Sequence, residues 1–255
     1  MGLGVATFAL SLLLSAGASG FTVVIDAGHG GSNRGAPTTK PDYFEKHLTL
    51  AIAKRVQRIL AVEKNLKVVL CRSTDALLPI RARVRCANQA GARLFISLHA
   101  NAAGPADEPG SQKGFEIFLL PVAEVDKEVA RVALLAPDDS EAAWAGHQVR
   151  TVAEQSLAAA RRIRWRFADT LGRDRDRGIK QEGATLDVLQ GLEMPAVLVE
   201  IGFLDHPEEG PYLLSEEGQR AIATALAGAI TDLRSRELRG LKEPMTTAPR
   251  ARHLP

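Results

Sequence analysis

Residues 93–101 read RLFISLHAN, a mainly apolar run that leads directly into a histidine. A short run of branched and aromatic residues without polar alternation is typical of a strand that is buried on both faces. Four other runs have the same character: FTVVID from Phe21, LKVVLC from Leu66, GFEIFLL from Gly114 and AVLVEI from Ala196. Strands of this kind occur mainly in parallel sheets, so the sequence predicts an α/β fold.

Segments with helical character separate these runs. A helix is expected between the first two runs, where apolar residues recur at helical spacing: Leu48, Ile52, Val56 and Ile59. Further helices are expected over residues 79–89 and 216–236, and the Ala-rich residues 124–173 predict one or two helices with a break near Pro137. The alternation of strands and helices predicts a single domain with a mainly parallel, twisted sheet and helices on both faces.

The composition is that of a globular protein, with 255 residues of which 45% are hydrophobic and 24% are charged. The net charge of +2 does not indicate nucleic-acid binding, which needs a concentrated basic face. Residues 1–20 combine an apolar core with small residues but lack a basic start; they predict a signal peptide, with a buried helix as the alternative. We therefore expect a periplasmic or secreted monomer without a stable membrane anchor. Its domain is expected over residues 21–238, before a disordered tail over residues 239–255.

The chain contains two cysteines, Cys71 and Cys86. An oxidising compartment would permit a bridge between them, but a domain of this size needs no disulfide, so we expect two buried thiols. Neither cysteine lies in a Gly-rich or His-containing loop of the kind that lowers a thiol pKa. This disfavours a catalytic thiol.

Two histidines directly follow predicted strands. His29 lies in IDAGHGG, where glycines allow a tight turn after the first strand, and His99 ends the apolar run of FISLHAN. In an open parallel sheet the carboxyl ends of the strands lie along one edge, so both imidazoles should face one crevice. A lone histidine in a turn is more often held by nearby backbone, but two that converge indicate a metal site. Asp26 and Asn101 are predicted either to orient the imidazoles or to stabilise turns.

Two glutamates complete this candidate site. Glu200 follows four apolar residues in AVLVEI, and because an unpaired buried carboxylate is costly, it is either a general base beside a metal or a side chain that has reached solvent. Glu45 begins the first helix and is the candidate third ligand, since hydrolytic zinc sites take three protein ligands and leave one position for water. The alternatives are a capping box of Asp42 and Glu45, and ligation by His47.

Five motifs together resemble those of the zinc-dependent N-acetylmuramoyl-L-alanine amidases of bacterial cell-wall turnover. They are IDAGHGG, FEKHLTLAIA, RVRCANQAGARLFISLHANAA, KGFEIFLL and MPAVLVEIGFLDHPEE, in this order. The resemblance covers nearly all of residues 21–233. It implies that His29, Glu45 and His99 bind Zn²⁺ and that Glu200 is the catalytic carboxylate.

The resemblance implies hydrolysis of the amide that joins N-acetylmuramic acid to L-alanine in peptidoglycan, for wall remodelling or cell separation. Ala27 and Cys71 depart from the family pattern, which usually has Pro and Thr there, but neither position carries a ligand. Residues 121–146 fit the family less well, and related enzymes can carry a blocking helix near such a place, so autoinhibition and a protein activator stay open. The alternative functions are another zinc peptidase or deacetylase, and a wall-binding pseudoenzyme, although all four site residues are present.

Overall fold

The computed structural model describes residues 20–104, 107–181 and 186–240. In this part of the chain six strands form one sheet in the order β2-β1-β3-β6-β4-β5. The strands are β1 (Phe21–Ala27), β2 (Leu66–Leu70), β3 (Leu94–Asn101), β4 (Phe115–Phe118), β5 (Asp176–Lys180) and β6 (Ala196–Phe203). Pairing is parallel except between β4 and β6, which confirms the predicted mainly parallel sheet. β5 was not predicted.

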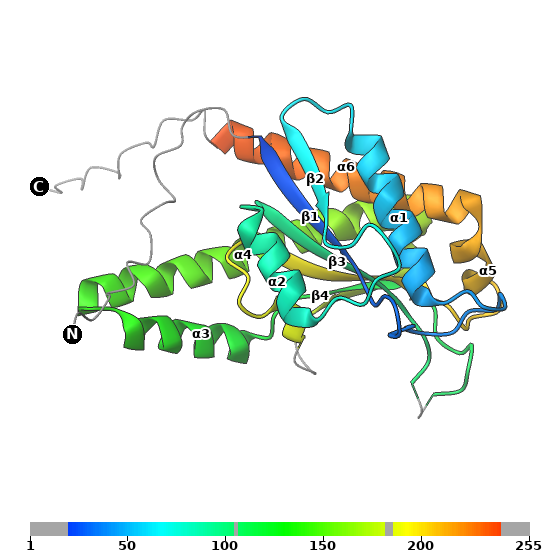
Figure 1. Cartoon of the computed structure of the whole chain (residues 1–255), viewed down its shortest axis with the longest axis horizontal. Coiled ribbons are helices and arrows are strands. Elements are labelled where there is room, and N and C mark those ends of the chain that lie inside the picture. Colours follow the sequence, from blue (N-terminus) through cyan, green and yellow to red (C-terminus); the bar gives the residue numbers. More distant parts are fainter. Residues whose placement is uncertain (1–19, 105–106, 182–185, 241–255) are drawn as a thin grey trace, which may run out of the picture.

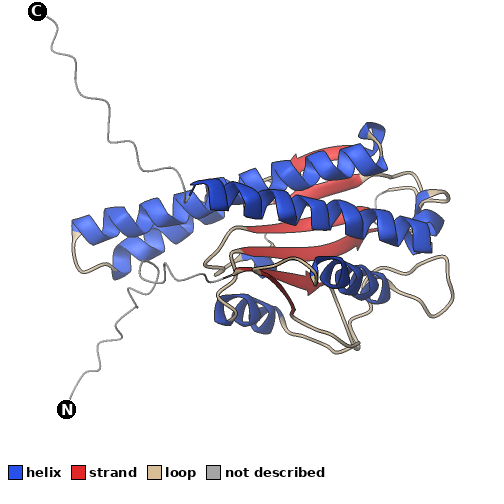
Figure 2. Cartoon of the chain, turned by 90° about the horizontal axis from the view of Figure 1, so that it is seen from above, coloured by secondary structure: helices blue, strands red, loops and turns tan. Residues whose placement is uncertain are grey.

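Helices cover both faces of the sheet (Figures 1 and 2). One face is covered by α1 (Glu45–Leu60), α4 (Asp139–Leu171) and α6 (Glu216–Gly240), and the other by α2 (Ile80–Gln89) and the short 3-10 helix η2 (Asp187–Leu189). The remaining elements are α3 (Val122–Leu135), η1 (Arg173–Arg175) and α5 (Glu209–Leu214). The predicted helices and the break near Pro137 are confirmed, whereas α5, η1 and η2 were not predicted. No helix in the described ranges is both long and apolar enough to cross a membrane.

The predicted signal peptide and tail lie almost entirely outside the described residues. The exceptions are Gly20 and the end of α6, which continues to Gly240, two residues into the segment predicted as a tail.

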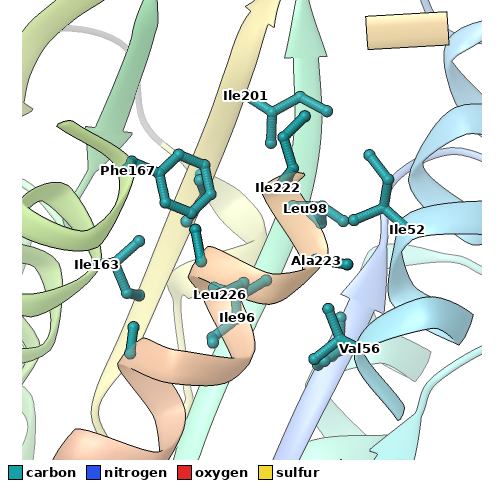
Figure 3. Close-up of a cluster of buried hydrophobic side chains, with 14 of the residues drawn as sticks. Ile52, Val56, Ile96, Leu98, Ile163, Phe167, Ile201, Ile222, Ala223 and Leu226 are labelled. Atoms are coloured by element: carbon teal, nitrogen blue, oxygen red, sulfur yellow. The ribbon is translucent and has the colours of Figure 1, made fainter. Parts of the chain in front are cut away.

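The larger part of the core lies between the sheet and the layer of α1, α4 and α6 (Figure 3). Side chains alternate along each strand, so Ile96, Leu98 and Ile201 point to this face, where they meet Ile222 and Leu226 of α6. A smaller apolar cluster packs α2 and η2 against the opposite face. The sheet is therefore apolar on both faces, as the sequence runs predicted.

One position of α1 differs from the prediction. Ile59, which was placed in the apolar row of this helix, is 39% exposed, whereas Leu60 is 2% exposed. The buried row advances in steps of four residues, and such a row is inclined to the helix axis. It therefore ends at Leu60 and leaves Ile59 at its outer side.

Helix α3 and the first half of α4 form a hairpin that projects beyond the sheet (Figures 1 and 2). β4 runs antiparallel to β6, so α3 begins at the edge of the sheet opposite to the carboxyl ends of β1, β3 and β6. The hairpin carries exposed apolar side chains at Leu134, Leu135 and Trp144. Residues 121–146, which fit the family pattern less well, thus lie away from the carboxyl edge.

We predict that Phe167→Ala lowers the free energy of unfolding by about 3–5 kcal/mol, because a buried aromatic side chain leaves a cavity when truncated. Phe167 is fully buried on α4, and its ring lies 5.4 Å from that of Phe115 in an edge-to-face contact. Urea denaturation followed by circular dichroism measures the change. The matched control is Trp144→Ala on the hairpin, where the side chain is 58% exposed and a change below about 0.5 kcal/mol is expected. Equal effects of the two substitutions would contradict this assignment of the core.

Candidate metal centre

Three residues from distant segments meet at the carboxyl edge of the sheet. His29 follows β1, His99 lies near the end of β3, and Glu45 is the first residue of α1. Glu45 Oε2 lies 2.9 Å from His29 Nε2, and Glu45 Oε1 lies 2.9 Å from His99 Nδ1. The ligand atoms of all three lie within 4.8 Å of one another. Imidazole nitrogens and carboxylate oxygens are typical zinc donors, so this cluster could hold a divalent metal ion.

Glu45 is 3% exposed, and its carboxylate is held by backbone as well as by imidazoles. It accepts hydrogen bonds from the N–H groups of Ala36 at 2.9 Å and Ala100 at 3.1 Å. Burial opposes ionisation, but the hydrogen bonds and charges of His29 and His99 outweigh it and hold the pKa of Glu45 well below its ordinary value. The carboxylate is therefore ionised, as a metal ligand must be.

His47, the alternative ligand, lies outside the cluster. Its Nδ1 accepts a hydrogen bond from the N–H of Phe44 at 2.9 Å, and its Nε2 lies 3.9 Å from Asp75 Oδ2. His47 thus satisfies a backbone donor at the start of α1. The alternative capping box of Asp42 and Glu45 is not formed, because the residue before the first turn is Phe44.

The orientation of His29 depends on Asn33, which the sequence analysis did not identify. His29 adopts a left-handed backbone conformation with φ of 61°, which a non-glycine residue rarely takes. Its Nδ1 lies 2.8 Å from Asn33 Oδ1 and its Nε2 lies 2.9 Å from Glu45 Oε2, so contacts on both nitrogens fix the orientation of the ring. Burial lowers the pKa of His29, but the hydrogen bond to Glu45 and its charge raise the pKa above the ordinary value.

Two buried arginines hold the backbone that presents His29. Arg72, which follows β2, donates from Nε to the carbonyl of Ala27 at 2.9 Å and from a terminal nitrogen to that of Gly28 at 2.8 Å. Arg83 of α2 donates to the carbonyls of Ala27 at 2.8 Å and His29 at 2.6 Å. The carbonyls of three successive residues are thus satisfied by guanidinium groups. We call Arg72 and Arg83 the arginine clamp.

Asp26 supports this clamp and does not orient the imidazole. Its Oδ1 lies 2.6 Å from a terminal nitrogen of Arg83, and its Oδ2 accepts a hydrogen bond from the hydroxyl of Ser97 at 3.1 Å. The carboxylate is fully buried, and the ion pair provides the partner that a buried charge requires. Of the two predicted roles for Asp26, orientation of His29 is therefore wrong.

Glu200 lies on β6, directly opposite His99 on β3 and Glu116 on β4. Cross-strand partners point to the same face, so the three side chains form a row across the sheet. Among the described residues, Glu200 Oε2 is the one buried side-chain oxygen or nitrogen without a hydrogen-bond partner. Burial, together with the charges of Glu45 and Glu116, raises the pKa of Glu200 well above its ordinary value. A carboxyl group in this environment is suited to accept and return a proton.

The same row contains another acidic residue, Glu116, which the sequence analysis did not identify. Its Oε1 accepts a hydrogen bond from the amide of Asn101 at 2.8 Å, and its Oε2 accepts one from Nε of Arg177 at 3.2 Å. Asn101 therefore contacts Glu116 rather than His99, so its predicted orienting role is also wrong. Unlike Glu200, Glu116 has partners for both oxygens.

Comparison with known proteins adds independent information. The family model described as N-acetylmuramoyl-L-alanine amidase matches residues 23–232. The chain is 32% identical over 224 residues to the N-acetylmuramoyl-L-alanine amidase AmiA of Escherichia coli (strain K12), covering 82% of this chain and 74% of that protein. It is 27% identical over 237 residues to a probable amidase AmiB of Haemophilus influenzae, covering 85% of this chain. The match covers 52% of that relative, so the chain spans about half of the relative's length.

Solved structures show the same fold. The catalytic domain of the amidase CwlV from Bacillus (Paenibacillus) polymyxa var. colistinus superposes with a TM-score of 0.64 at 31% identity, covering 83% of this chain and 97% of that one. The amidase AmiC2 of Nostoc punctiforme superposes with a TM-score of 0.64 at 28% identity, covering 88% of this chain and 98% of that one.

We predict that Gly28→Ala displaces His99 and weakens metal binding. A Cβ at position 28 would lie 2.4, 2.6 and 2.7 Å from three ring atoms of His99, so the imidazole must move. Zinc retained after dialysis, measured by atomic absorption, should fall by about tenfold or more, as for other changes that misplace a ligand. Gly104→Ala is the matched control, since its Cβ would come no closer than 3.4 Å to its neighbour. Full zinc retention by Gly28→Ala would refute the role of His99 as a ligand.

Proposed function

Because this chain belongs to the N-acetylmuramoyl-L-alanine amidase family, we propose that it hydrolyses the amide bond between N-acetylmuramic acid and L-alanine in peptidoglycan, with zinc as cofactor. The observation that carries the proposal is the cluster of His29, Glu45 and His99 beside Glu200, whose buried oxygen has no partner. The named amidases among the relatives and solved structures support the substrate.

The residues fit a catalytic zinc ion in number and in kind. Two imidazoles and one ionised carboxylate are a donor set found in zinc hydrolases, which leave a further position for water. The buried Oε2 of Glu200 gives independent support. A buried oxygen without a hydrogen-bond partner costs free energy, and a bound ligand or a proton beside Glu200 would supply the missing partner. We therefore assign His29, Glu45 and His99 as zinc ligands and Glu200 as the catalytic carboxylate.

The proposed reaction needs one proton carrier. A zinc ion at this site would polarise the amide carbonyl and acidify the attacking water. Glu200 accepts the proton of that water through its free oxygen and returns it to the amide nitrogen, because the amine leaves only after protonation. Glu116, across the strands from Glu200, already accepts hydrogen bonds with both oxygens, so Glu200 is the better proton carrier.

We assign residues 21–238 as the catalytic domain and place its action outside the cytoplasm, in the periplasm or after secretion. Peptidoglycan lies outside the cytoplasmic membrane, and the predicted signal peptide would direct the chain there. Another zinc peptidase or deacetylase would use the same ligands, and the names of the relatives favour the muramoyl amide over both. The presence of all four site residues argues against a pseudoenzyme.

We predict that Glu200→Gln lowers the rate of peptidoglycan hydrolysis by about a hundredfold to ten-thousandfold while zinc content is retained, because the carboxylate acts as a proton carrier and not as a ligand. Dye release from labelled sacculi and atomic absorption measure the two quantities. Glu193→Gln, an exposed position just before β6, is the matched control and should leave both unchanged. Undiminished turnover by Glu200→Gln would remove Glu200 from the mechanism.

The bond that is cut can be identified from the products. We predict that mass spectrometry of digested peptidoglycan finds intact stem peptides that begin with L-alanine, together with glycan strands that keep their acetyl groups. Shorter peptides would indicate a peptidase, and free acetate would indicate a deacetylase. Either of these outcomes would replace the proposed substrate bond.

The hairpin of α3 and α4 is not placed to block the site, so we predict that trimming it does not activate the enzyme. Asp126 and Arg150 form an ion pair across the hairpin at 3.1 Å, so residues 127–149 can be replaced by a short Gly-Ser linker. The hydrolysis rate should stay within about twofold of the full chain, as expected for a projecting segment that bears no site residue. A rise of about tenfold would show instead that the hairpin inhibits the site.

A further inference from the structure

The two cysteines lie side by side between the end of β2 and α2. The N–H of Cys71 donates to the carbonyl of Ile25 at 3.2 Å, and the sulfur of Cys71 lies 3.7 Å from the carbonyl oxygen of Arg83, one helical turn before Cys86. The two thiols are close enough to change each other's pKa, which is raised for Cys71 and lowered for Cys86. Both are free and partly buried against the smaller core under α2.

Each cysteine is next to one member of the arginine clamp. Arg72 directly follows Cys71, and Arg83 precedes Cys86 by three residues on α2. Arg72 also donates to the carbonyl of Lys46 on α1 at 2.8 Å, so the clamp connects the elements on both faces of β1. A covalent link between the cysteines would therefore connect the backbone segments that carry the two guanidinium groups.

We propose that Cys71 and Cys86 form a disulfide in an oxidising environment and that this bond stiffens the loop that presents His29. The proposal goes beyond the proposed function and does not depend on it. The sequence predicted two buried thiols, and we propose here that these thiols form a disulfide when a disulfide donor is present.

The chemistry is thiol–disulfide exchange with a protein or low-molecular-weight disulfide. The neighbouring thiol of Cys71 lowers the pKa of Cys86, and the interaction between the two thiols raises the pKa of Cys71. Cys86 as thiolate attacks the incoming disulfide, forms a mixed disulfide and releases one thiolate. Cys71 then loses its proton, attacks the sulfur of Cys86 and releases the second thiolate. The two protons end on the released thiols, so two thiols of the chain are oxidised and one external disulfide is reduced.

The bond should be visible in thiol content and in thermal stability. We expect the full chain, reduced and then treated with glutathione disulfide, to lose both alkylatable thiols and to yield one joined peptide with Cys71 and Cys86 after digestion. The midpoint of thermal unfolding should rise by about 5–10 °C, because the bond constrains the unfolded chain. Reaction of both thiols with the alkylating agent after this treatment, or glutathione on each cysteine, would overturn the proposal.

Single-thiol variants supply the matched controls. Cys71→Ser and Cys86→Ser should each take up one glutathione and show no rise in the unfolding midpoint. An equal rise in these variants would show that the stabilisation does not come from the bridge.

The effect on the His29 loop has its own measurement. Hydrogen exchange of residues 26–31, followed by mass spectrometry, should be about threefold or more slower in the oxidised chain than in the reduced chain. In the variant with both substitutions, Cys71→Ser and Cys86→Ser, exchange should not respond to glutathione disulfide. Equal exchange in the oxidised and reduced chains would overturn the link between the bridge and the loop. Because no metal is needed for either measurement, failure of the bridge and failure of the proposed hydrolase can be told apart.

Discussion

The carboxylate of Glu45 joins β1, β3 and α1 at one point, and the geometry of the site depends on this contact. It is buried, and it stays ionised because two imidazoles and two backbone N–H groups surround it. Glu45 begins α1, whose apolar row from Leu48 to Leu60 is packed against the sheet and α6. Core packing of a whole helix therefore fixes one carboxylate against the two histidines, so the rigid scaffold holds the three candidate ligands in place.

A second set of buried charges supports the first. His29 adopts a left-handed conformation, which costs free energy of about 1–3 kcal/mol and persists only where the surroundings enforce it. The arginine clamp provides that enforcement, because its two guanidinium groups together bind the carbonyls of residues 27–29. Loss of Arg83 would leave Asp26 buried without its cation, and breaking such a pair costs about 3–5 kcal/mol. The same buried contacts therefore contribute both to the stability of the fold and to the position of His29.

The strands that could be predicted from the sequence are the apolar ones, and most of the candidate site residues were predicted because they follow these apolar runs. His29, His99 and Glu200 were singled out because each follows an apolar run, and the structure brings the three together near the carboxyl edge of the sheet. β5 was missed because DRGIK is an edge strand whose pairing depends on backbone and not on an apolar run. The partners of Asp26 and of His29 were missed for another reason: spacing along the chain does not show which distant side chain will meet a given group. Arg83 and Ser97 reach Asp26 from α2 and β3, and only the packed structure shows this.

Because β4 runs antiparallel to β6, the hairpin and the candidate site lie at opposite ends of the molecule. These two ends tolerate sequence changes to different degrees. At the carboxyl end of β1, β3 and β6, contacts among many segments leave little freedom, and even a methyl group at Gly28 meets the ring of His99. At the other end, α3 and the first half of α4 form the projecting hairpin, whose length does not affect the geometry of the site. Evolution or protein engineering could lengthen or shorten this hairpin, or add a fused reporter domain at its tip, while the opposite end keeps its arrangement.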